Sequence, residues 1–327
     1  MPTLYEGARR LVTVCGRVKA DERALIITDD NKYEIAQNVR NVILDEIKGD
    51  VTLAVIGGQK AGGQEPPAPV AAAMKAADII YMITSHSLSQ TLARTEAQKA
   101  GARVLSIPDP QISDITSRMI EADFEALSPY IHKVAESLSD AREIRFTAPG
   151  GTDMTFSAVG MKGRGLDLLA HNPGEFRSMS VEANVGPAFG TANGVVVFDA
   201  SIPIVGPLDE PVRVRIEKGF AVEIEGGEKA KQFARLLMDF DDPYVYNIGE
   251  FGIGLNPCAR PTGNSYVEDE SAIGTCHIGF GTNLSQGGNI KAACHIDAIV
   301  LSPTVEADGR LIMKEGELVE VPIKPLV

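Results

Sequence analysis

Two histidines near the C-terminal end of the chain stand beside other residues that can do chemistry. His277 and His295 lie in the stretch GTCHIGFGTNLSQGGNIKAACHID, and His295 comes two residues before Asp297. Side chains alternate between the two faces of a β-strand, so HxD on a strand places an imidazole and a carboxylate side by side. Both groups are ligands of Zn²⁺ and Fe²⁺. The spacing therefore predicts a metal site, with a hydrogen-bonded surface pair as the alternative.

Each of these histidines directly follows a cysteine, which suggests a thiolate site as another possibility. On a strand, however, Cys276 and Cys294 would face away from the histidines that follow them, so a single site could not easily use both kinds of ligand. The chain has two further cysteines, Cys15 and Cys258, and no CxxC. We expect all four to be reduced and to pack as small apolar side chains.

The elements around the histidines have the texture of β-hairpins. AREIRFTAPGGTDMTFSAVG alternates apolar and polar residues around a Gly-Gly-Thr-Asp turn, and GVVVFDASIPIVG and PVRVRIEKGFAVEIEGG continue this pattern. One helix is expected in EKAKQFARLLMDF, at 228–240. Residues 141–327 should therefore form a β-rich α+β domain that carries the metal site.

The first 140 residues alternate instead between helix and strand. ERALIITDD and VTLAVIGG read as short buried strands, and PPAPVAAAMKAADIIYMITS and LSQTLARTEAQKAGARVLSIPD each read as a helix followed by a strand. DITSRMIEADFEALSPYIHKVAESLSDA reads as one long helical stretch. This alternation predicts an α/β Rossmann-like layer domain over 1–140, with a parallel sheet covered on both faces.

Length and composition limit the classes of function. A chain of 327 residues suits two domains, and 44% hydrophobic with 23% charged residues is typical of a globular protein. The formal net charge of −13 argues against nucleic acid and anionic membranes as partners. We see no signal peptide and no apolar stretch of membrane-spanning length, so we expect a cytoplasmic protein. GxGxxG and GK[ST] are absent, so no nucleotide cofactor is expected, and the roles of His86 and His171 stay open.

The motifs of the second half resemble those of the thermophilic aminopeptidase family, the aminopeptidase T and S type. They are GEFGIGLNP at 249–257, EDESAIGTCHIGFG at 268–281, GGN at 287–289 and HID at 295–297, in the family's order and approximate spacing. Upstream, SVEANVGPAFGTANGVVVFDAS at 180–201 resembles another family segment. The resemblance extends from about residue 140 to residue 300.

This resemblance implies a dinuclear metal site whose ligands would be Glu182, Glu250, His277, His295 and Asp297. Three carboxylates and two imidazoles suit two divalent ions (Zn²⁺, Mn²⁺ or Co²⁺), and a water held between such ions becomes a nucleophile near neutral pH. We therefore expect a metal-dependent hydrolase of an amide bond in a small molecule or short peptide. The peptidase relatives and the apolar hairpins together predict a homodimer.

Other residues connect the chain to a shorter branch, the 2,5-dihydroxypyridine dioxygenases. Ser271 and Leu284 replace a Lys and a Tyr of the peptidase pattern, whereas TAPGGTD, ending at Asp153, and IGEFGIGLNPCAR, at 248–260, resemble dioxygenase segments. This branch implies one Fe²⁺ held by two His and one Asp, and ring cleavage of a hydroxylated N-heterocycle as the alternative function. Its first ligand His corresponds to Glu250 here, and GEFRSMSVEA, at 174–183, lacks its upstream His.

Overall fold

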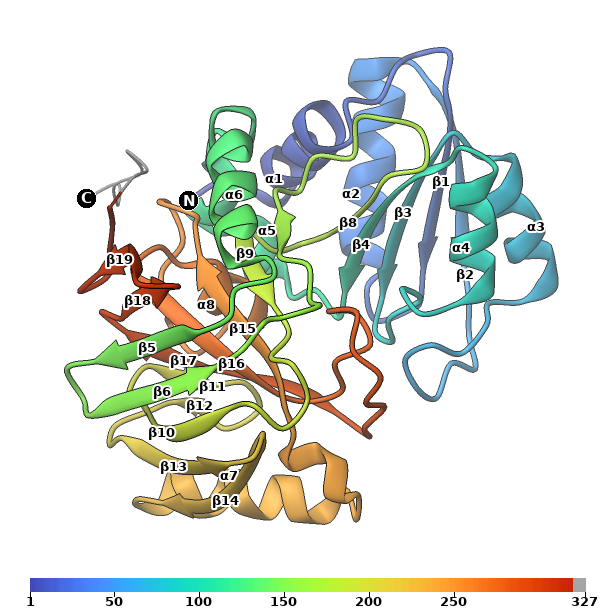
Figure 1. The fold of residues 1–327 in the computed structure, drawn as a ribbon. Helices are drawn as coiled ribbons and strands as arrows, with labels where there is room; N and C mark the ends of the chain where they lie inside the picture. Colours follow the sequence, from blue (N-terminus) through green and yellow to red (C-terminus); the bar gives the residue numbers. More distant parts are fainter. Residues whose placement is uncertain (320–327) are drawn as a thin grey trace. The chain divides into compact units, whose positions relative to one another are not determined.

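The computed structural model describes residues 1–319, which fold as two units (Figure 1). The first unit comprises residues 1–125 and 167–180, and the second comprises residues 126–166 and those from 181 onward. The sequence predicted one boundary, between residues 140 and 141, whereas each unit of the structure is formed by two separate segments of the chain. The segment 167–180 returns to the first unit because it contributes strand β8 (Phe176–Ser178), which pairs with β4 (Arg103–Pro108).

The first unit is built on a parallel sheet, so the expected mixed α/β architecture is confirmed. The strand order is β2-β1-β3-β4-β8, with β1 at Arg23–Thr28, β2 at Asp50–Val55 and β3 at Ile79–Thr84. Strands β1, β3 and β4 are buried almost throughout, as expected for apolar strands covered on both faces. The expectation of a buried β2 is wrong, because this strand lies at the edge of the sheet and Val55 is exposed.

Helices pack on both faces of this sheet. On one face, Met74 of α3 (Ala68–Ala76) and Ala97 of α4 (Leu92–Lys99) contact the apolar side chains of the strands. On the other, the Tyr81 hydroxyl donates to the carbonyl of Leu11, the first residue of the π-helical turn η1 (Leu11–Cys15). The chain begins with α1 (Leu4–Arg10), which Thr3 and Glu6 cap reciprocally. The α2 helix (Tyr33–Val42) and the turn η2 (Ile43–Ile47) follow β1.

The segment expected as one long helix is three separate elements. They are α5 (Ile112–Thr116), the 3₁₀ turn η3 (Arg118–Glu121) and α6 (Phe124–Leu138). Ser117 interrupts the first junction because its backbone is extended and its side chain accepts the N–H of Met119. Ala122 is also extended and separates η3 from α6. Local capping therefore overrides the apolar periodicity of this stretch.

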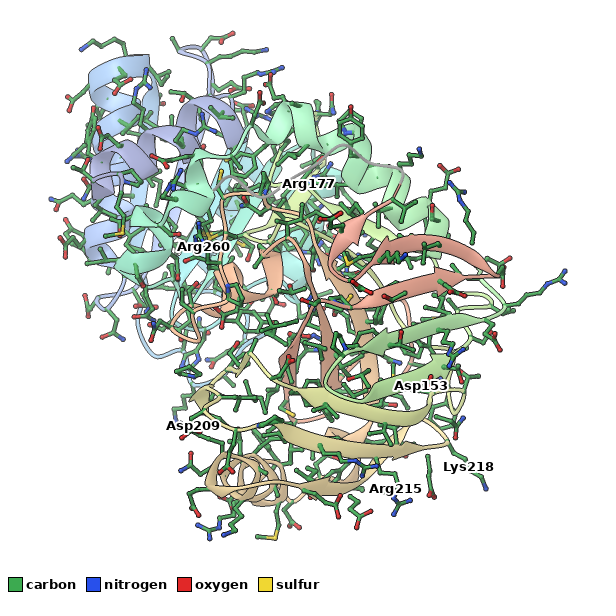
Figure 2. The ribbon with its side chains drawn as sticks, turned by 90° about the vertical axis from the view of Figure 1, so that its left-hand side faces the viewer. Asp153, Arg177, Asp209, Arg215, Lys218 and Arg260 are labelled. Carbon is green, nitrogen blue, oxygen red and sulfur yellow. The ribbon has the colours of Figure 1, made fainter. Side chains whose placement is uncertain are left out.

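The second unit contains an antiparallel sheet of eight strands in the part of the chain described. Its order is β14-β13-β10-β6-β5-β18-β19-β20. The strands are β5 (Ile144–Ala148), β6 (Thr152–Phe156), β10 (Asn193–Phe198), β13 (Val212–Glu217), β14 (Phe220–Glu225), β18 (Thr304–Ala307), β19 (Arg310–Lys314) and β20 (Glu317–Leu318). The predicted β5–β6 and β13–β14 hairpins are both confirmed. Lys218 and Gly219 have φ values of 48° and 83° at the β13–β14 turn, and Figure 2 labels Lys218 and Arg215 on this hairpin.

A second antiparallel sheet, of five strands, has the order β17-β16-β15-β9-β7. Its strands are β7 (Arg164–Leu166), β9 (Glu182–Val185), β15 (Ile248–Gly254), β16 (Thr275–Gly281) and β17 (His295–Leu301). The remaining elements of the unit are the two-stranded β11 (Ser201–Ile202) and β12 (Gly206–Pro207), the helices α7 (Glu228–Asp239) and α8 (Tyr266–Ser271), and the 3₁₀ turn η4 (Pro243–Tyr246). The predicted helix at 228–240 corresponds to α7.

One face of the five-stranded sheet is apolar and packs against the eight-stranded sheet. The ring of Phe251 lies 5.4 Å from Phe146 and 5.3 Å from Phe156, measured between centroids. On the next strand, the ring of Phe280 lies 5.8 Å from Phe198 and 5.1 Å from Phe233 of α7. These buried aromatic pairs fix the sheet on this side and leave its opposite face for polar side chains.

A β-bulge at Gly249 decides which face Glu250 occupies. Ile248 pairs with Phe280, whereas Glu250 pairs with Gly279, so one extra residue stands between them. Residues directly opposite in an antiparallel pair share a face, and a shift of one residue reverses the face. Without the bulge, Glu250 would share the aromatic face with Ile248; with it, Glu250 lies on the polar face.

None of the helices between residues 1 and 319 combines the length and apolar character needed to cross a bilayer.

The aromatic face gives a test of this packing. Replacing the fully buried Phe280 with Ala removes its contacts with Phe198 and Phe233, so we expect the free energy of unfolding to fall by about 3–5 kcal/mol in urea titrations. Phe189 is 63% exposed, and Phe189→Ala serves as the control with an expected change below about 1 kcal/mol. Equal losses for the two variants would contradict this account of the core.

Candidate metal centre

Five side chains converge on the polar face of the five-stranded sheet, and they are the five singled out by the sequence. Glu182 opens β9, Glu250 lies on β15, His277 on β16, and His295 and Asp297 on β17. They form two groups that share Glu250, and the candidate ligand atoms of each group lie within 4.8 Å of one another. One group is Glu182–Glu250–His277, and the other is Glu250–His295–Asp297.

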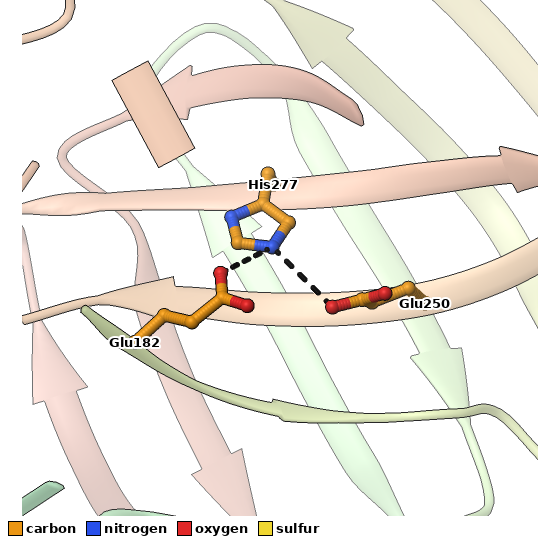
Figure 3. Close-up of side chains that lie close together, drawn as sticks. All are labelled: Glu182, Glu250 and His277. Carbon is orange, nitrogen blue, oxygen red and sulfur yellow. Dashed lines mark ion pairs between the residues drawn. The ribbon is translucent and has the colours of Figure 1, made fainter. Parts of the chain in front are cut away.

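In the first group, two carboxylates approach the same imidazole nitrogen. His277 Nε2 lies 3.1 Å from Glu182 Oε2 and 3.8 Å from Glu250 Oε1 (Figure 3). The three side chains come from three adjacent strands, so the pairing of β9, β15 and β16 brings them together.

In the second group, His295 lies between two carboxylates. Its Nε2 is 3.1 Å from Glu250 Oε2 and 3.3 Å from Asp297 Oδ2. The other ring nitrogen, Nδ1, lies 2.9 Å from the carbonyl oxygen of Thr282. A proton on Nδ1 that is donated to this carbonyl leaves Nε2 free to act as a ligand. Asp297 and His295 share a face of β17, as the alternation of side chains along a strand requires.

Glycines opposite these side chains provide the space for them. Gly252 pairs with His277 across the sheet, and a Cβ on Gly252 would lie 2.0 Å from His277 Nε2. Gly279 pairs with both Asp297 and Glu250, and a Cβ there would lie 2.7 Å from Asp297 Oδ1 and from Glu250 Cβ. A side chain at either position would displace the cluster.

Each carboxylate of the cluster also accepts a hydrogen bond from a neutral side chain. Asn184 Nδ2 donates to Glu182 Oε1 at 2.7 Å, Gln286 donates to Glu250 Oε2, and the Tyr266 hydroxyl donates to Asp297 Oδ2. Sequence reasoning missed all three donors. The period of two along β9 could have found Asn184, two residues after Glu182, whereas no local spacing points to Gln286 or Tyr266.

The cluster is buried and leaves polar atoms without hydrogen-bond partners. Glu182, Glu250, His277 and Asp297 are all less than 5% exposed. Among residues 1–319, Glu182 Oε2, Asp297 Oδ1 and both ring nitrogens of His277 make no well-aligned hydrogen bond, although His277 Nε2 and Glu182 Oε2 lie 3.1 Å apart. Such atoms are costly to bury unless something compensates them, and a divalent cation would do so. The donor set of carboxylate oxygens and imidazole nitrogens fits that ion.

The carboxylates hold protons on the imidazoles when no metal is bound. Burial disfavours charged imidazoles, but Glu182 and Glu250 outweigh burial at His277 and raise its pKa well above the ordinary value. Asp297 and Glu250 do the same for the pKa of His295. Burial would raise the pKa of Glu250, but its contacts with both histidines lower that pKa far below the usual range. At Glu182, burial prevails over the contact with His277, and the pKa is raised.

Other residues noted in the sequence have structural positions. Ser271, at the place of the peptidase Lys, accepts the N–H of Val181 and donates to the carbonyl of Val267. Leu284, at the place of the peptidase Tyr, is 44% exposed. Cys276 is buried, and burial raises the pKa of its thiol well above the ordinary value. Neither Ser271 nor Leu284 reproduces the chemistry of the peptidase residue.

Comparisons with known proteins identify two groups of relatives. The family model described as NicX, 2,5-dihydroxypyridine 5,6-dioxygenase, matches residues 9–320. The 2,5-dihydroxypyridine 5,6-dioxygenase of Pseudomonas putida is 25% identical over 266 residues, which cover 76% of this chain and 72% of that protein. Aminopeptidase T of Thermus thermophilus is 32% identical over 135 residues, but the match covers only 36% of this chain and 32% of the peptidase.

Solved structures of the same two enzymes share the fold. The 2,5-dihydroxypyridine dioxygenase from Pseudomonas putida KT2440 superposes with a TM-score of 0.82 at 20% identity, over 98% of this chain and 97% of that chain. The Thermus thermophilus aminopeptidase T superposes with a TM-score of 0.66 at 18% identity, over 97% and 98%. The mixed architecture of one parallel and several antiparallel sheets is therefore common to both enzymes.

These matches correct the expected function. An amide hydrolase as the main function is wrong, because the family match over nearly the whole chain and the longer match to a named relative both belong to the dioxygenases. The peptidase likeness is limited to shared fold and to a shorter segment. From its match over residues 9–320, the chain belongs to the 2,5-dihydroxypyridine 5,6-dioxygenase family.

Proposed function

We propose that this protein is an Fe²⁺-dependent dioxygenase that cleaves the ring of a dihydroxypyridine or a similar hydroxylated N-heterocycle. The family match over residues 9–320 supports the reaction class. The observation that carries the proposal is the Glu250–His295–Asp297 group, in which two carboxylates and one imidazole converge from two strands of one sheet face. Fe²⁺ held by three protein ligands on one side keeps open positions for substrate and O₂.

The residues of this group have distinct tasks in the proposal. Glu250 and Asp297 supply two negative charges, which balance a divalent ion in a buried site. The carbonyl of Thr282 fixes the ring of His295 so that Nε2 faces the two carboxylates. Gln286 holds one oxygen of Glu250 and thereby orients it. Glu250 stands where the dioxygenase pattern has His, so this chain would bind the ion with one more negative charge.

The neighbouring pair of Glu182 and His277 lies beyond Glu250. We assign it the task of a general acid that donates the proton on His277 Nε2 to the reacting substrate, because two carboxylates face this atom and raise the pKa of the imidazole. The two-ion site expected from the peptidase resemblance would instead fill this position with metal. Metal analysis decides between these occupants: one equivalent supports the dioxygenase proposal, and two equivalents support a dinuclear site.

Oxygen consumption tests the reaction directly. We expect protein loaded anaerobically with Fe²⁺ to consume O₂ and to bleach the ring absorbance of 2,5-dihydroxypyridine, and we expect His295→Ala and Glu250→Ala to abolish both signals. Glu250→His should keep measurable activity, because imidazole is an equally suitable Fe²⁺ ligand. Glu223→Ala, on the exposed side of β14, is the control and should match the wild type. No O₂ uptake with Fe²⁺-loaded wild type on a panel of dihydroxypyridines would reject the proposal.

A glycine variant separates the two groups of the cluster. Gly252→Ala places a Cβ 2.0 Å from His277 Nε2, so the imidazole must move, while His295 and Asp297 keep their surroundings. We expect one equivalent of metal to remain bound and kcat to fall by about 10²-fold or more, the usual range for a lost proton-transfer group. Gly57→Ala, with no heavy atom near the added Cβ, is the matched control. Unchanged kcat in Gly252→Ala would remove His277 from the mechanism.

Metal binding should strengthen as the pH rises. The pKa values of His277 and His295 are both raised, and a metal in the Glu250–His295–Asp297 group must displace the proton of His295. In the metal-free protein these protonated imidazoles stabilise the fold at low pH, and this stabilisation is lost as the pH rises through their raised pKa values. The gain in Tm on adding Mn²⁺ should therefore be larger at about pH 8.5 than at about pH 6. Equal gains at both pH values would show that His295 does not ligate the ion.

A further inference from the structure

The three neutral donors around the cluster differ in their access to solvent. Asn184 is 1% exposed and Gln286 is 5% exposed, so both amides are enclosed by the protein. Tyr266 is 40% exposed, although its hydroxyl donates to Oδ2 of the buried Asp297. Tyr266 therefore extends from a carboxylate of the candidate metal group to the surface, with its polar end inward and part of its ring outward.

The position of Tyr266 is fixed by the scaffold around it. It is the first residue of α8, and the side chain of Ser265 caps this helix by accepting the N–H of Glu268. At the other end, Ser271 donates to the carbonyl of Val267 and accepts the N–H of Val181, the residue before Glu182. The helix that carries Tyr266 is thus tied directly to the strand that carries Glu182, and the phenol is held in place beside the cluster.

We propose that Tyr266 positions Asp297 for metal binding and that its exposed ring forms one wall of the binding site for an aromatic substrate. The first part follows from the hydroxyl, which occupies one oxygen of Asp297 and leaves Oδ1, without a hydrogen-bond partner in the described chain, for the ion. The second part rests on the proposed function, because a flat hydroxylated heterocycle gains from contact with an aromatic ring. Asn184 and Gln286 cannot take this role, since both are enclosed.

Two substitutions separate the two parts. Tyr266→Phe removes the hydroxyl and keeps the ring, whereas Tyr266→Leu removes both. Mn²⁺, a redox-stable probe, is titrated into each metal-free protein by calorimetry, and 2,5-dihydroxypyridine is then titrated anaerobically into the Mn²⁺-loaded forms. Tyr244→Phe is the control, because Tyr244 is 46% exposed, lies in η4 and is not one of the side chains of the metal-ligand groups.

We expect Tyr266→Phe to weaken Mn²⁺ binding by about 10-fold or more, the usual effect of losing a hydrogen bond to a metal ligand, with no change in the Tm of the metal-free protein. At saturating Mn²⁺, Tyr266→Phe should bind the pyridine nearly as the wild type does, whereas Tyr266→Leu should bind it about 3- to 10-fold more weakly. The Tyr244→Phe control should leave both affinities unchanged.

The Mn²⁺ titration needs no substrate, so it tests the positioning role independently of the proposed function. Unchanged Mn²⁺ affinity in Tyr266→Phe overturns that role. A weaker Mn²⁺ affinity accompanied by a lower Tm of the metal-free protein also overturns it, because that result would mark a general structural effect. Equal pyridine affinity in Tyr266→Phe and Tyr266→Leu overturns the wall. A wild type that binds Mn²⁺ but none of the pyridine defeats the proposed function and the wall together, and leaves the positioning role to be judged by the Mn²⁺ result.

Discussion

The candidate centre depends on one carboxylate that serves two imidazoles. Glu250 presents Oε2 to His295 at 3.1 Å and Oε1 to His277 at 3.8 Å, and it is 4% exposed. Burying this charge is costly unless it is compensated from both sides. Two features of the second unit provide this compensation. The bulge at Gly249 turns Glu250 to the polar face, and the pairing of β15 with β16 and of β16 with β17 brings both His277 and His295 close to its carboxylate.

One face of the five-stranded sheet packs in the core, and the other face carries the candidate metal ligands. Phe251 and Phe280 supply buried aromatic contacts on one face, and such contacts contribute favourably to folding. On the other face, glycines at 252 and 279 give up side-chain packing so that the charged cluster fits. The aromatic face allows the sheet to carry such a cluster, since the two sets of side chains alternate along the same strands.

The family assignment indicates the reaction class, whereas the ligand set determines which ion the site can hold. The match over residues 9–320 places the whole chain among the dioxygenases, whereas the cluster keeps Glu250 where the dioxygenase pattern has His. A carboxylate in place of an imidazole would add one negative charge beside a bound divalent ion. This difference can alter which divalent ion is preferred and how tightly it is held, without any change in the fold. Fold and family alone therefore do not specify the chemistry of the site.

The sequence by itself determined the features that follow from local periodicity and turn chemistry. These include the shared face of His295 and Asp297, the two hairpins at Gly150 and Gly219, and the parallel sheet of the first unit. The tertiary structure alone decided which face Glu250 occupies, since that depends on a bulge opposite Phe280, and it alone brought Tyr266 and Gln286 to the cluster. It also placed β8, which lies beyond residue 140 in the sequence, beside β4 in the parallel sheet of the first unit. These features rest on strand register and long-range packing, which contacts between neighbouring residues in the chain do not encode.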